Sequence, residues 1–395
     1  MRATDSARAV SPPTITYCGN VHPAESLEEW LGVLAGPSAA VARAFPGGGD
    51  GFPLGVWWTA ATAAALAHDR AACDRVREAL ARERLRIATL NVFPYGGFHA
   101  PVVKAAVYRP DWADPRRLGY TLDAARAVAQ LVPPGTTVPL STLPLGFGRG
   151  DLDAMAEQLR AAARALARIE AEHGVVAVLA LEPEPCCLLE RVIDTADFLE
   201  GRVFARSEDE ALLRRHLGVC VDLCHLAVVG EDALFALASL HARDVAIAKL
   251  QVSSCLELRD GAALDLLLAF DEPRYLHQTV ADDGRLRALD LGEVRQRRRE
   301  FETARRIRTH FHVPLFWDDR GVLGSTQAEL QRVLAALPRE APLLEVETYT
   351  WSVFDPAWRP ERDLVAGIVR ELTWLERHRA RTDRGAGGPV SCAPS

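Results

Sequence analysis

The chain has 395 residues, of which 49% are hydrophobic and 25% charged, so it is long enough to bury a large core and is not a disordered chain. Its formal net charge of −7, without a basic stripe, argues against nucleic acid as a partner. No apolar run reaches the roughly 18 residues of a membrane span and the first residues lack the apolar segment of a signal peptide, so we expect a cytoplasmic protein that does not insert into a membrane.

Short apolar runs alternate along the chain with longer segments of helical period. Eight of these runs predict strands, at residues 14–20, 53–58, 86–93, 137–143, 175–182, 218–223, 245–253 and 343–350. The helix between the fourth and fifth strands is the clearest, because Asp151 can cap its start and Gly174 follows its end. Regular alternation implies a parallel sheet covered by helices, and eight units predict a closed (β/α)8 TIM barrel.

An open, doubly wound sheet is the alternative fold. It would usually carry a phosphate-binding turn between an early strand and its helix, but the glycine-rich stretch 47–51 precedes a strand instead. We expect one barrel over residues 13–380, with disordered tails at 1–12 and 381–395. A long insertion at about 254–325 would lie above the barrel. Within it we expect the helix that follows the seventh strand to begin near Asp290.

Polar side chains gather where four successive strands end, and in a barrel this is where active sites lie. The ends carry Glu182 and Glu184, Asp222 and His225, Lys249, Gln251 and Ser253, and Glu345 and Glu347. Carboxylates crowded at one mouth repel each other unless a cation lies among them. We therefore predict a divalent metal ion, Mn²⁺, Mg²⁺, Zn²⁺ or Fe²⁺, with the oxygen-rich balance favouring Mn²⁺ or Mg²⁺.

Several further polar residues extend this prediction. His310 and His312 share one side of a β-like segment at 310–316 and could hold a second metal, and His277 is another candidate ligand. Glu184 and Glu345 are expected to support the site. The eight cysteines lack the paired CxxC spacing of a zinc site, which indicates buried free thiols.

The strand-end residues bear a family resemblance. Glu182 in ALEPEP, the DxxH of Asp222 and His225, the KLQVSS strand and Glu347 resemble the metal-site pattern of the xylose isomerase-like barrels, the sugar phosphate isomerase/epimerase superfamily. This resemblance implies one metal held by Glu, Asp, His and Glu from successive strands. Gln251 stands where the histidine is expected, so either the metal is held more loosely or His225, His277 or His312 substitutes.

Longer blocks are similar to a narrower group, the EboE family of metabolite traffic proteins. The blocks are TYCGNVHPAES, TLNVFPYGGFH, STLPLGF, HFHVPLF, STQ and LEVETYTW, between residues 16 and 351. The resemblance implies a divalent-metal barrel that works with other ebo-cluster proteins, which move or process a small metabolite for export. It implies no particular reaction.

Three functions remain open. The first is an isomerase or epimerase of a small polyol, cyclitol or sugar-like metabolite, with Glu182 and Glu347 as the acid/base pair and Lys249 holding an enediolate oxygen or a phosphate. Substrate contacts would come from Asn91, Tyr95, His99, His22 and Ser253. The second is a multinuclear metal-dependent phosphoester hydrolase. The third is a metabolite-binding protein of the ebo export system that catalyses nothing.

Overall fold

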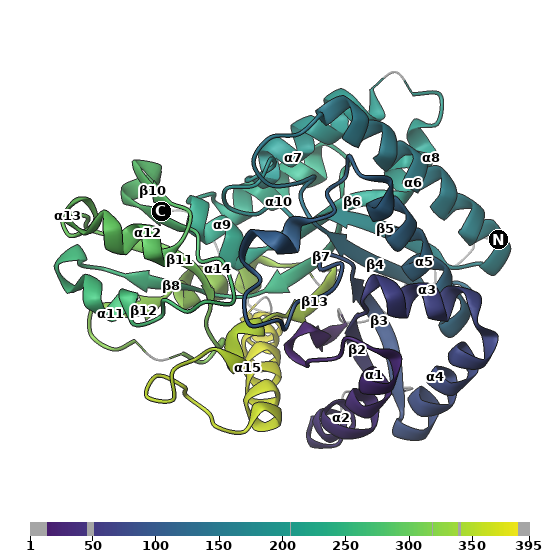
Figure 1. Cartoon of the computed structure of the whole chain (residues 1–395), viewed down its shortest axis with the longest axis horizontal. Coiled ribbons are helices and arrows are strands. Elements are labelled where there is room, and N and C mark those ends of the chain that lie inside the picture. Colours follow the sequence, from purple (N-terminus) through teal and green to yellow (C-terminus); the bar gives the residue numbers. More distant parts are fainter. Residues whose placement is uncertain (1–13, 46–50, 206, 318, 339–340, 386–395) are drawn as a thin grey trace, which may run out of the picture.

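The structure, a computed structural model, describes residues 14–45, 51–205, 207–317, 319–338 and 341–385 (Figure 1). Eight parallel strands form one sheet in the order β1-β13-β7-β6-β5-β4-β3-β2. They are β1 (Ile15–Tyr17), β2 (Phe52–Trp57), β3 (Leu85–Asn91), β4 (Thr137–Thr142), β5 (Val176–Leu181), β6 (Leu217–Asp222), β7 (Ala246–Val252) and β13 (Leu343–Val346). Each coincides with a predicted strand.

The seam between β1 and β2 closes the sheet into a barrel. A parallel bridge joins Cys18 to Gly55 across it. The hydroxyl of Thr16 spans the same seam, because it donates to the carbonyl of Pro53 at 2.8 Å and accepts the backbone N–H of Gly55 at 2.9 Å. The protein is therefore a (β/α)8 TIM barrel, as the sequence predicts.

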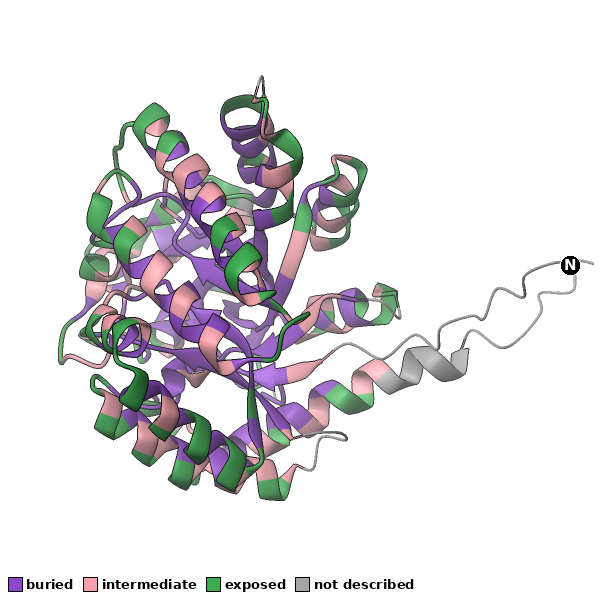
Figure 2. Ribbon diagram, turned by 90° about the vertical axis from the view of Figure 1, so that its right-hand side faces the viewer, coloured by how far each residue is buried: buried purple, intermediate pink, exposed green. Residues whose placement is uncertain are grey.

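Helices surround the strands and cover them from solvent (Figure 2). They are α1 (Leu27–Val33), α2 (Ala39–Ala44), α3 (Ala60–His68), α4 (Arg70–Glu83), α5 (Pro115–Leu131), α6 (Leu152–His173), α7 (Val192–Phe198), α8 (Glu210–His216), α9 (Leu223–Val229), α10 (Ala233–Ala242), α14 (Gln327–Ala336) and α15 (Leu364–Gly385). The predicted helix caps of α6 are confirmed: the side chain of Asp151 accepts two backbone N–H groups, and Gly174 ends the helix in the left-handed conformation, with φ of 69°.

The segment between β7 and α14 forms a second, smaller layer beside the barrel mouth (Figure 1). Its strands are β8 (Cys255–Leu258), β9 (Thr279–Ala281), β10 (Leu286–Ala288), β11 (Ile307–His312) and β12 (Leu323–Ser325), and its helices are α11 (Leu264–Leu268), α12 (Leu291–Gln296) and α13 (Arg298–Phe301). The strands pair antiparallel in the order β10-β9-β11-β8-β12. This insertion has a hydrophobic core of its own.

The helix near Asp290 does not cover the barrel. It is α12, whose apolar residues Leu291 and Val294 pack into the core of the insertion. The helix that follows β7 in the barrel is α14, whose Leu330, Val333 and Leu334 belong to the barrel core. The expectation was wrong because both segments carry the same helical pattern.

The predicted N-terminal tail and residues 386–395 lie outside the described residues, and α15 reaches Gly385, inside the segment expected as the C-terminal tail. Among the described helices, no single one is long and apolar enough to cross a membrane. Helices α9 and α10 meet that test only as a pair, and the pair is bent by 112°.

Candidate metal centre

A cavity lies where the carboxyl ends of the barrel strands meet the insertion. Both parts of the chain supply its polar floor: Glu182 follows β5, Glu347 follows β13, and His310 and His312 come from β11. Alternate residues of a strand share a face, so the two histidines reach the floor together. All four side chains are buried. The insertion thus completes a site that the barrel begins.

Asp222 and His225 owe their positions to one helix start. The side chain of Asp222 caps α9 by accepting the backbone N–H of His225 at 3.0 Å. The hydroxyl of Ser253 donates to the same oxygen, Asp222 Oδ1, at 2.8 Å and accepts the backbone N–H of Cys224 at 2.9 Å. One carboxylate oxygen is therefore held by the fold, and the other, Oδ2, has no hydrogen-bond partner among the described residues.

Three carboxylates from different strands converge. One oxygen each of Glu182, Asp222 and Glu347 lie within 4.8 Å of one another. Among the described residues, the recorded ion pairs give none of the three an arginine partner. The amide of Asn20 donates to Glu347 Oε1 at 2.8 Å, whereas Glu182 Oε2 is buried without a hydrogen-bond partner in the described part of the chain. A buried, unpaired carboxylate is costly unless a cation or a proton neutralises it.

The pKa values follow from this crowding. Burial, with Glu347 and Asp222 nearby, raises the pKa of Glu182 well above its usual range. Burial, together with Asp222 and Glu345, raises the pKa of Glu347 to about 8. Burial and the neighbouring acids therefore favour the protonated form of both carboxyl groups, and a bound metal ion would favour their ionised form.

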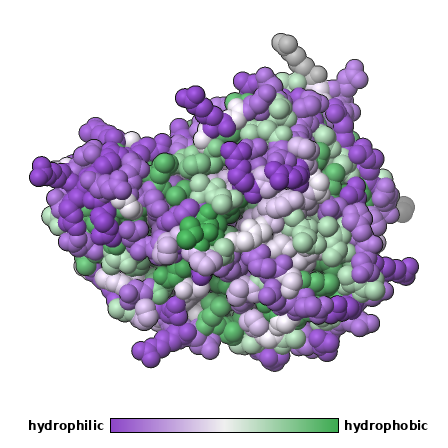
Figure 3. Space-filling model, viewed as in Figure 1, coloured by the Kyte–Doolittle hydropathy of each residue, from purple (hydrophilic) through white to green (hydrophobic). Residues whose placement is uncertain are grey.

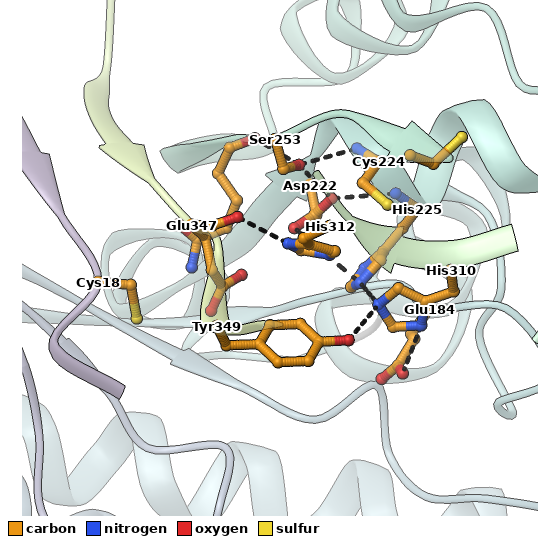
Figure 4. A network of polar contacts seen from close by, with 12 residues as sticks. Cys18, Glu184, Asp222, Cys224, His225, Ser253, His310, His312, Glu347 and Tyr349 are labelled. Atoms are coloured by element: carbon orange, nitrogen blue, oxygen red, sulfur yellow. Dashed lines mark hydrogen bonds and ion pairs between the residues drawn. The ribbon is translucent and has the colours of Figure 1, made fainter. Parts of the chain in front are cut away.

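Three imidazoles beside the carboxylates present their second nitrogen to the same space (Figure 4). The Nδ1 atoms of His225 and His312 lie 2.8 and 2.7 Å from the backbone oxygens of Pro183 and Glu347. Nδ1 of His310 lies 2.7 Å from Gln278 Oε1. These oxygens only accept hydrogen bonds, so each Nδ1 carries a hydrogen, and in a neutral ring Nε2 then keeps the lone pair that can bind a metal.

The Nε2 atoms of the three rings lie close to each other and to Asp222 Oδ2. Nε2 of His225 lies 3.1 Å from Nε2 of His310. Asp222 Oδ2 lies 3.9 Å from Nε2 of both His225 and His312. Burial lowers the pKa of His312 to about 4 and that of His310 well below its usual range, so both rings are neutral near pH 7. The hydroxyl of Tyr349, 3.3 Å from His310 Nε2, can donate to one of these lone pairs.

The donor atoms fit divalent cations. Four overlapping groups could each hold one: Glu182, Asp222 and Glu347; Asp222, His225 and His312; Glu184, His225 and His310; and Cys224, His310 and His312. The first group offers only oxygens, which suits Mg²⁺ or Mn²⁺, and the others add imidazole nitrogens, which suit Zn²⁺. The orphaned Glu182 Oε2, Asp222 Oδ2 and His312 Nε2 are the atoms that such ions would satisfy. The chemistry favours a divalent ion without choosing the element.

Two predicted ligands need separate treatment. Gln251 pairs in register with Asp222 on β6, is fully buried, and has both amide atoms without partners among the described residues, so its role as a ligand stays a prediction. His277 has protein partners on both ring nitrogens: its Nδ1 lies 2.9 Å from the carbonyl of His310 and its Nε2 2.9 Å from Glu272 Oε1. These contacts do not favour a metal, and its role as a ligand stays a prediction.

Lys249 lies away from the predicted substrate site. Its ammonium forms a fully buried ion pair with Glu345 inside the barrel and does not line the cavity. Burial opposes the charge, but Glu345 raises the pKa of Lys249 above its ordinary value. The other oxygen of Glu345 fills the space where a side chain on Gly55 would begin, which explains the glycine. This pairing favours a structural role for Lys249, and its predicted contact with a substrate oxygen or a phosphate stays a prediction.

The predicted substrate contacts divide into two kinds. Asn91 lines the cavity, and its amide lies 3.5 Å from Glu347 Oε1. Ser253 is buried against Asp222 and does not line the cavity. His22 lies 3.1 Å from the hydroxyl of Tyr17, Tyr95 packs on Tyr120, and His99 packs on Trp57. These last three also lie outside the cavity lining, so the structure gives their predicted role as substrate contacts no support and it stays a prediction.

Sequence reasoning underrated Glu184 and His310. Glu184 Oε1 accepts the hydroxyl of Tyr108 at 2.6 Å and lies 3.5 Å from His310 Nδ1. Its spacing of two from Glu182, and that of His310 from His312, were the available signals, because both spacings place two side chains on one face. Tyr349 has the same spacing of two from Glu347, whereas Tyr108 and Gln278 carried no such signal. The seven described cysteines are free, as predicted, and Cys224 alone joins a donor group.

Comparisons with known proteins give the following. A scan against protein-family models found no match, and a search of the curated proteins found none. Among solved structures, a xylose isomerase domain protein from Alicyclobacillus acidocaldarius subsp. acidocaldarius is 16% identical, with a TM-score of 0.46 over 94% of this chain and 99% of that chain. The D-allulose 3-epimerase from Methylomonas sp. is 12% identical, with a TM-score of 0.46 over 94% and 100%. The IOLI protein, solved with a zinc atom, is 11% identical, with a TM-score of 0.45 over 93% and 99%. The resemblance to the EboE family gains no support from these matches.

Proposed function

We propose that this protein is a metal-dependent isomerase or epimerase that moves a proton between carbon atoms of a small polyol, cyclitol or sugar-like metabolite. The observation that carries the proposal is the convergence of Glu182, Asp222 and Glu347 within 4.8 Å, with Glu182 and Glu347 lining the cavity. Acidic groups with raised pKa values, in a cavity that also holds metal ligands, are typical of proton-transfer sites.

The chain's own residues supply the acid and the base. Glu182 and Glu347 follow strands that are separated in the sheet by β6 and β7, so they approach a ligand from different sides. With raised pKa values, one carboxyl can hold a proton while the other accepts one near neutral pH. Asn20 and Asn91 hold Glu347 in place through its Oε1. A bound divalent ion would polarise a carbonyl or acidify a hydroxyl of the substrate.

The proposed cellular role rests on the sequence blocks that resemble the EboE family. The resemblance to the EboE family supports a cytoplasmic role beside other ebo-cluster proteins, with the product destined for export. Failure of a pull-down with those proteins to recover the chain would remove this part and leave the isomerase proposal intact.

Proton transfer is tested by isotope exchange. Manganese-loaded protein is incubated with a panel of ketoses in D₂O, and carbon-bound deuterium is measured by NMR. We expect incorporation into at least one sugar and its loss in the Glu182→Gln variant, which keeps the shape of the side chain but not its basicity. No deuterium in any sugar would count against the proposal.

A second function, phosphoester hydrolysis, is favoured by one observation. Asp222 belongs both to the carboxylate group and to the group with His225 and His312, and a shared carboxylate is how two-metal hydrolases hold their ions. Plasma emission spectroscopy separates the cases: about one metal per chain favours isomerisation, and two or three with turnover of a p-nitrophenyl phosphodiester favour hydrolysis. A bound metal with neither activity leaves the metabolite-binding role.

A further inference from the structure

The outer wall of the cavity is aromatic, in contrast to its polar floor. Phe98, Tyr275 and Tyr349 line it and touch each other: ring centroids lie 5.1 Å apart for Phe98 and Tyr275 and 4.9 Å apart for Tyr275 and Tyr349. Val103 and Trp57 belong to the same apolar cluster. Hydrophobic surface also appears near the middle of the molecule, where the insertion meets the barrel (Figure 3). Such a wall removes apolar ligand surface from water.

The wall offers no free cation. Among the described lining residues, Lys104 is the single lysine and no arginine is present. The ammonium of Lys104 already has three partners: Asp290 Oδ2 at 2.7 Å and the backbone oxygens of Tyr275 and Glu272 at 2.7 and 2.9 Å. An ammonium has three N–H donors, so none remains for a ligand. A phosphate or carboxylate on the outer part of a ligand would stay unpaired.

The wall is also held in place before a ligand arrives. The backbone N–H groups of Val103 and Lys104 both lie 2.8 Å from the carbonyl oxygen of Arg274, which ties the loop after β3 to the insertion. The guanidinium of Arg274 donates to the carbonyl of Ala100 at 3.1 Å and to the hydroxyl of Ser352 at 3.1 Å. A preformed wall selects ligands by shape and polarity.

We propose that the ligand is uncharged at its outer end and carries an apolar ring or alkyl group there, which packs on Phe98, Tyr275 and Tyr349, while neighbouring oxygens at its other end face the carboxylates and histidines. A cyclitol or sugar with an apolar substituent fits this description, and a sugar phosphate does not. The inference rests on the proposed metal-dependent function and narrows its substrate class.

Three probes with one metal-binding head test the proposal. Zinc binding is first measured by calorimetry, and the zinc-loaded protein is then titrated with acetohydroxamate, benzohydroxamate and 4-carboxybenzohydroxamate. Burying a phenyl ring instead of a methyl group should make benzohydroxamate about 30-fold tighter than acetohydroxamate. The added carboxylate should weaken binding by at least about 10-fold, because no cation is free to pair with it.

Two variants locate the effect. Phe98→Ala should cut the preference for benzohydroxamate by about 10-fold while leaving acetohydroxamate binding within about twofold. Phe235→Ala removes a phenylalanine that is 64% exposed on α10 and should change neither affinity. A protein that takes up no zinc overturns the metal centre, and this inference with it. A zinc-loaded protein that binds the first two probes equally, or binds neither, overturns this inference alone.

Discussion

Nε2 of His225 lies 3.1 Å from Nε2 of His310, although each ring already donates its Nδ1 hydrogen to an oxygen. A contact this short needs a proton or another cation between or beside the two nitrogens, because two facing lone pairs repel each other. The nearby Asp222 Oδ2 is likewise without a partner among the described residues. The hydrogen bonds at the Nδ1 atoms therefore orient the Nε2 atoms and Asp222 Oδ2 toward a space that suits a cation.

Removing an imidazole should weaken metal binding. His312→Ala and His225→Ala are each expected to lower zinc affinity by about 100-fold or more, because each loses one donor atom beside Asp222. His216→Asn is the matched control. That buried histidine precedes β6 at the opposite end of the strand, with Nδ1 2.9 Å from the carbonyl of Ala177. Calorimetric titration measures all three, and equal losses in the control would contradict the assignment.

Ser253 should act on the metal through Asp222. Ser253→Ala removes the donor at 2.8 Å from Asp222 Oδ1 and is expected to lower zinc affinity by about 10-fold to 100-fold with little change in unfolding. Ser254→Ala removes a hydroxyl of the adjacent buried residue, which lies 3.3 Å from the hydroxyl of Thr326, and should leave zinc affinity unchanged. Zinc affinity of both variants is measured by competition with a chromogenic chelator.

The ion pair inside the barrel should matter for stability and not for the chemistry. Lys249→Met leaves Glu345 buried and unpaired, so we expect a loss of about 3–5 kcal/mol in the free energy of unfolding by urea. The double variant Lys249→Met with Glu345→Met should recover most of that loss. Full recovery of stability with complete loss of deuterium exchange would restore Lys249 to the catalytic groups.

Stability of the metal-free protein should fall as pH rises from about 7.5 to 8.5. The folded state raises the pKa of Glu347 to about 8, so it holds a proton that the unfolded chain has already released. The folded state then binds more protons, and the free energy of unfolding decreases with pH, by roughly 1.4 kcal/mol per pH unit per proton. His312, with a pKa lowered to about 4, is neutral in the folded state but partly protonated in the unfolded chain near pH 6.5, so it opposes the trend there and stops contributing above about pH 7.5.

A bound metal should abolish that trend. A metal ion displaces the proton from Glu347. The affinity of the protein for the metal ion therefore rises with pH over the range in which this carboxyl group ionises. Chemical unfolding with EDTA and with excess zinc, at several pH values, measures both slopes. A metal-free protein that becomes more stable between pH 7.5 and 8.5 would show that Glu347 is ionised without a metal.

The barrel strands could be predicted because each is a short apolar run that must be buried on both faces. The covering helices were harder to assign. Asp290 caps α12 and is followed by apolar residues, so the local pattern matches that of a barrel helix. Only packing distinguishes the two, and it places Leu291 in the insertion core while Leu330 of α14 joins the barrel core.

The site was predictable where strand ends decide it. Glu182, Asp222 and Glu347 converge because the carboxyl ends of parallel strands share one rim. The ion pair of Lys249 could not be predicted, because its partner Glu345 is 96 residues away in the sequence. This partner turns an inward-facing ammonium into a buried ion pair. The contact of His277 with Glu272 could not be predicted for a similar reason. Both residues lie on the same loop, and no spacing rule shows that the carboxylate contacts Nε2 of the ring.

Anomalous X-ray diffraction from crystals soaked in zinc tests the central claim most directly. We expect at least one anomalous peak within bonding distance of Asp222, shared either with Glu182 and Glu347 or with His225 and His312. Peaks confined to surface residues, with the Asp222 carboxylate bonded to protein groups alone, would contradict the account.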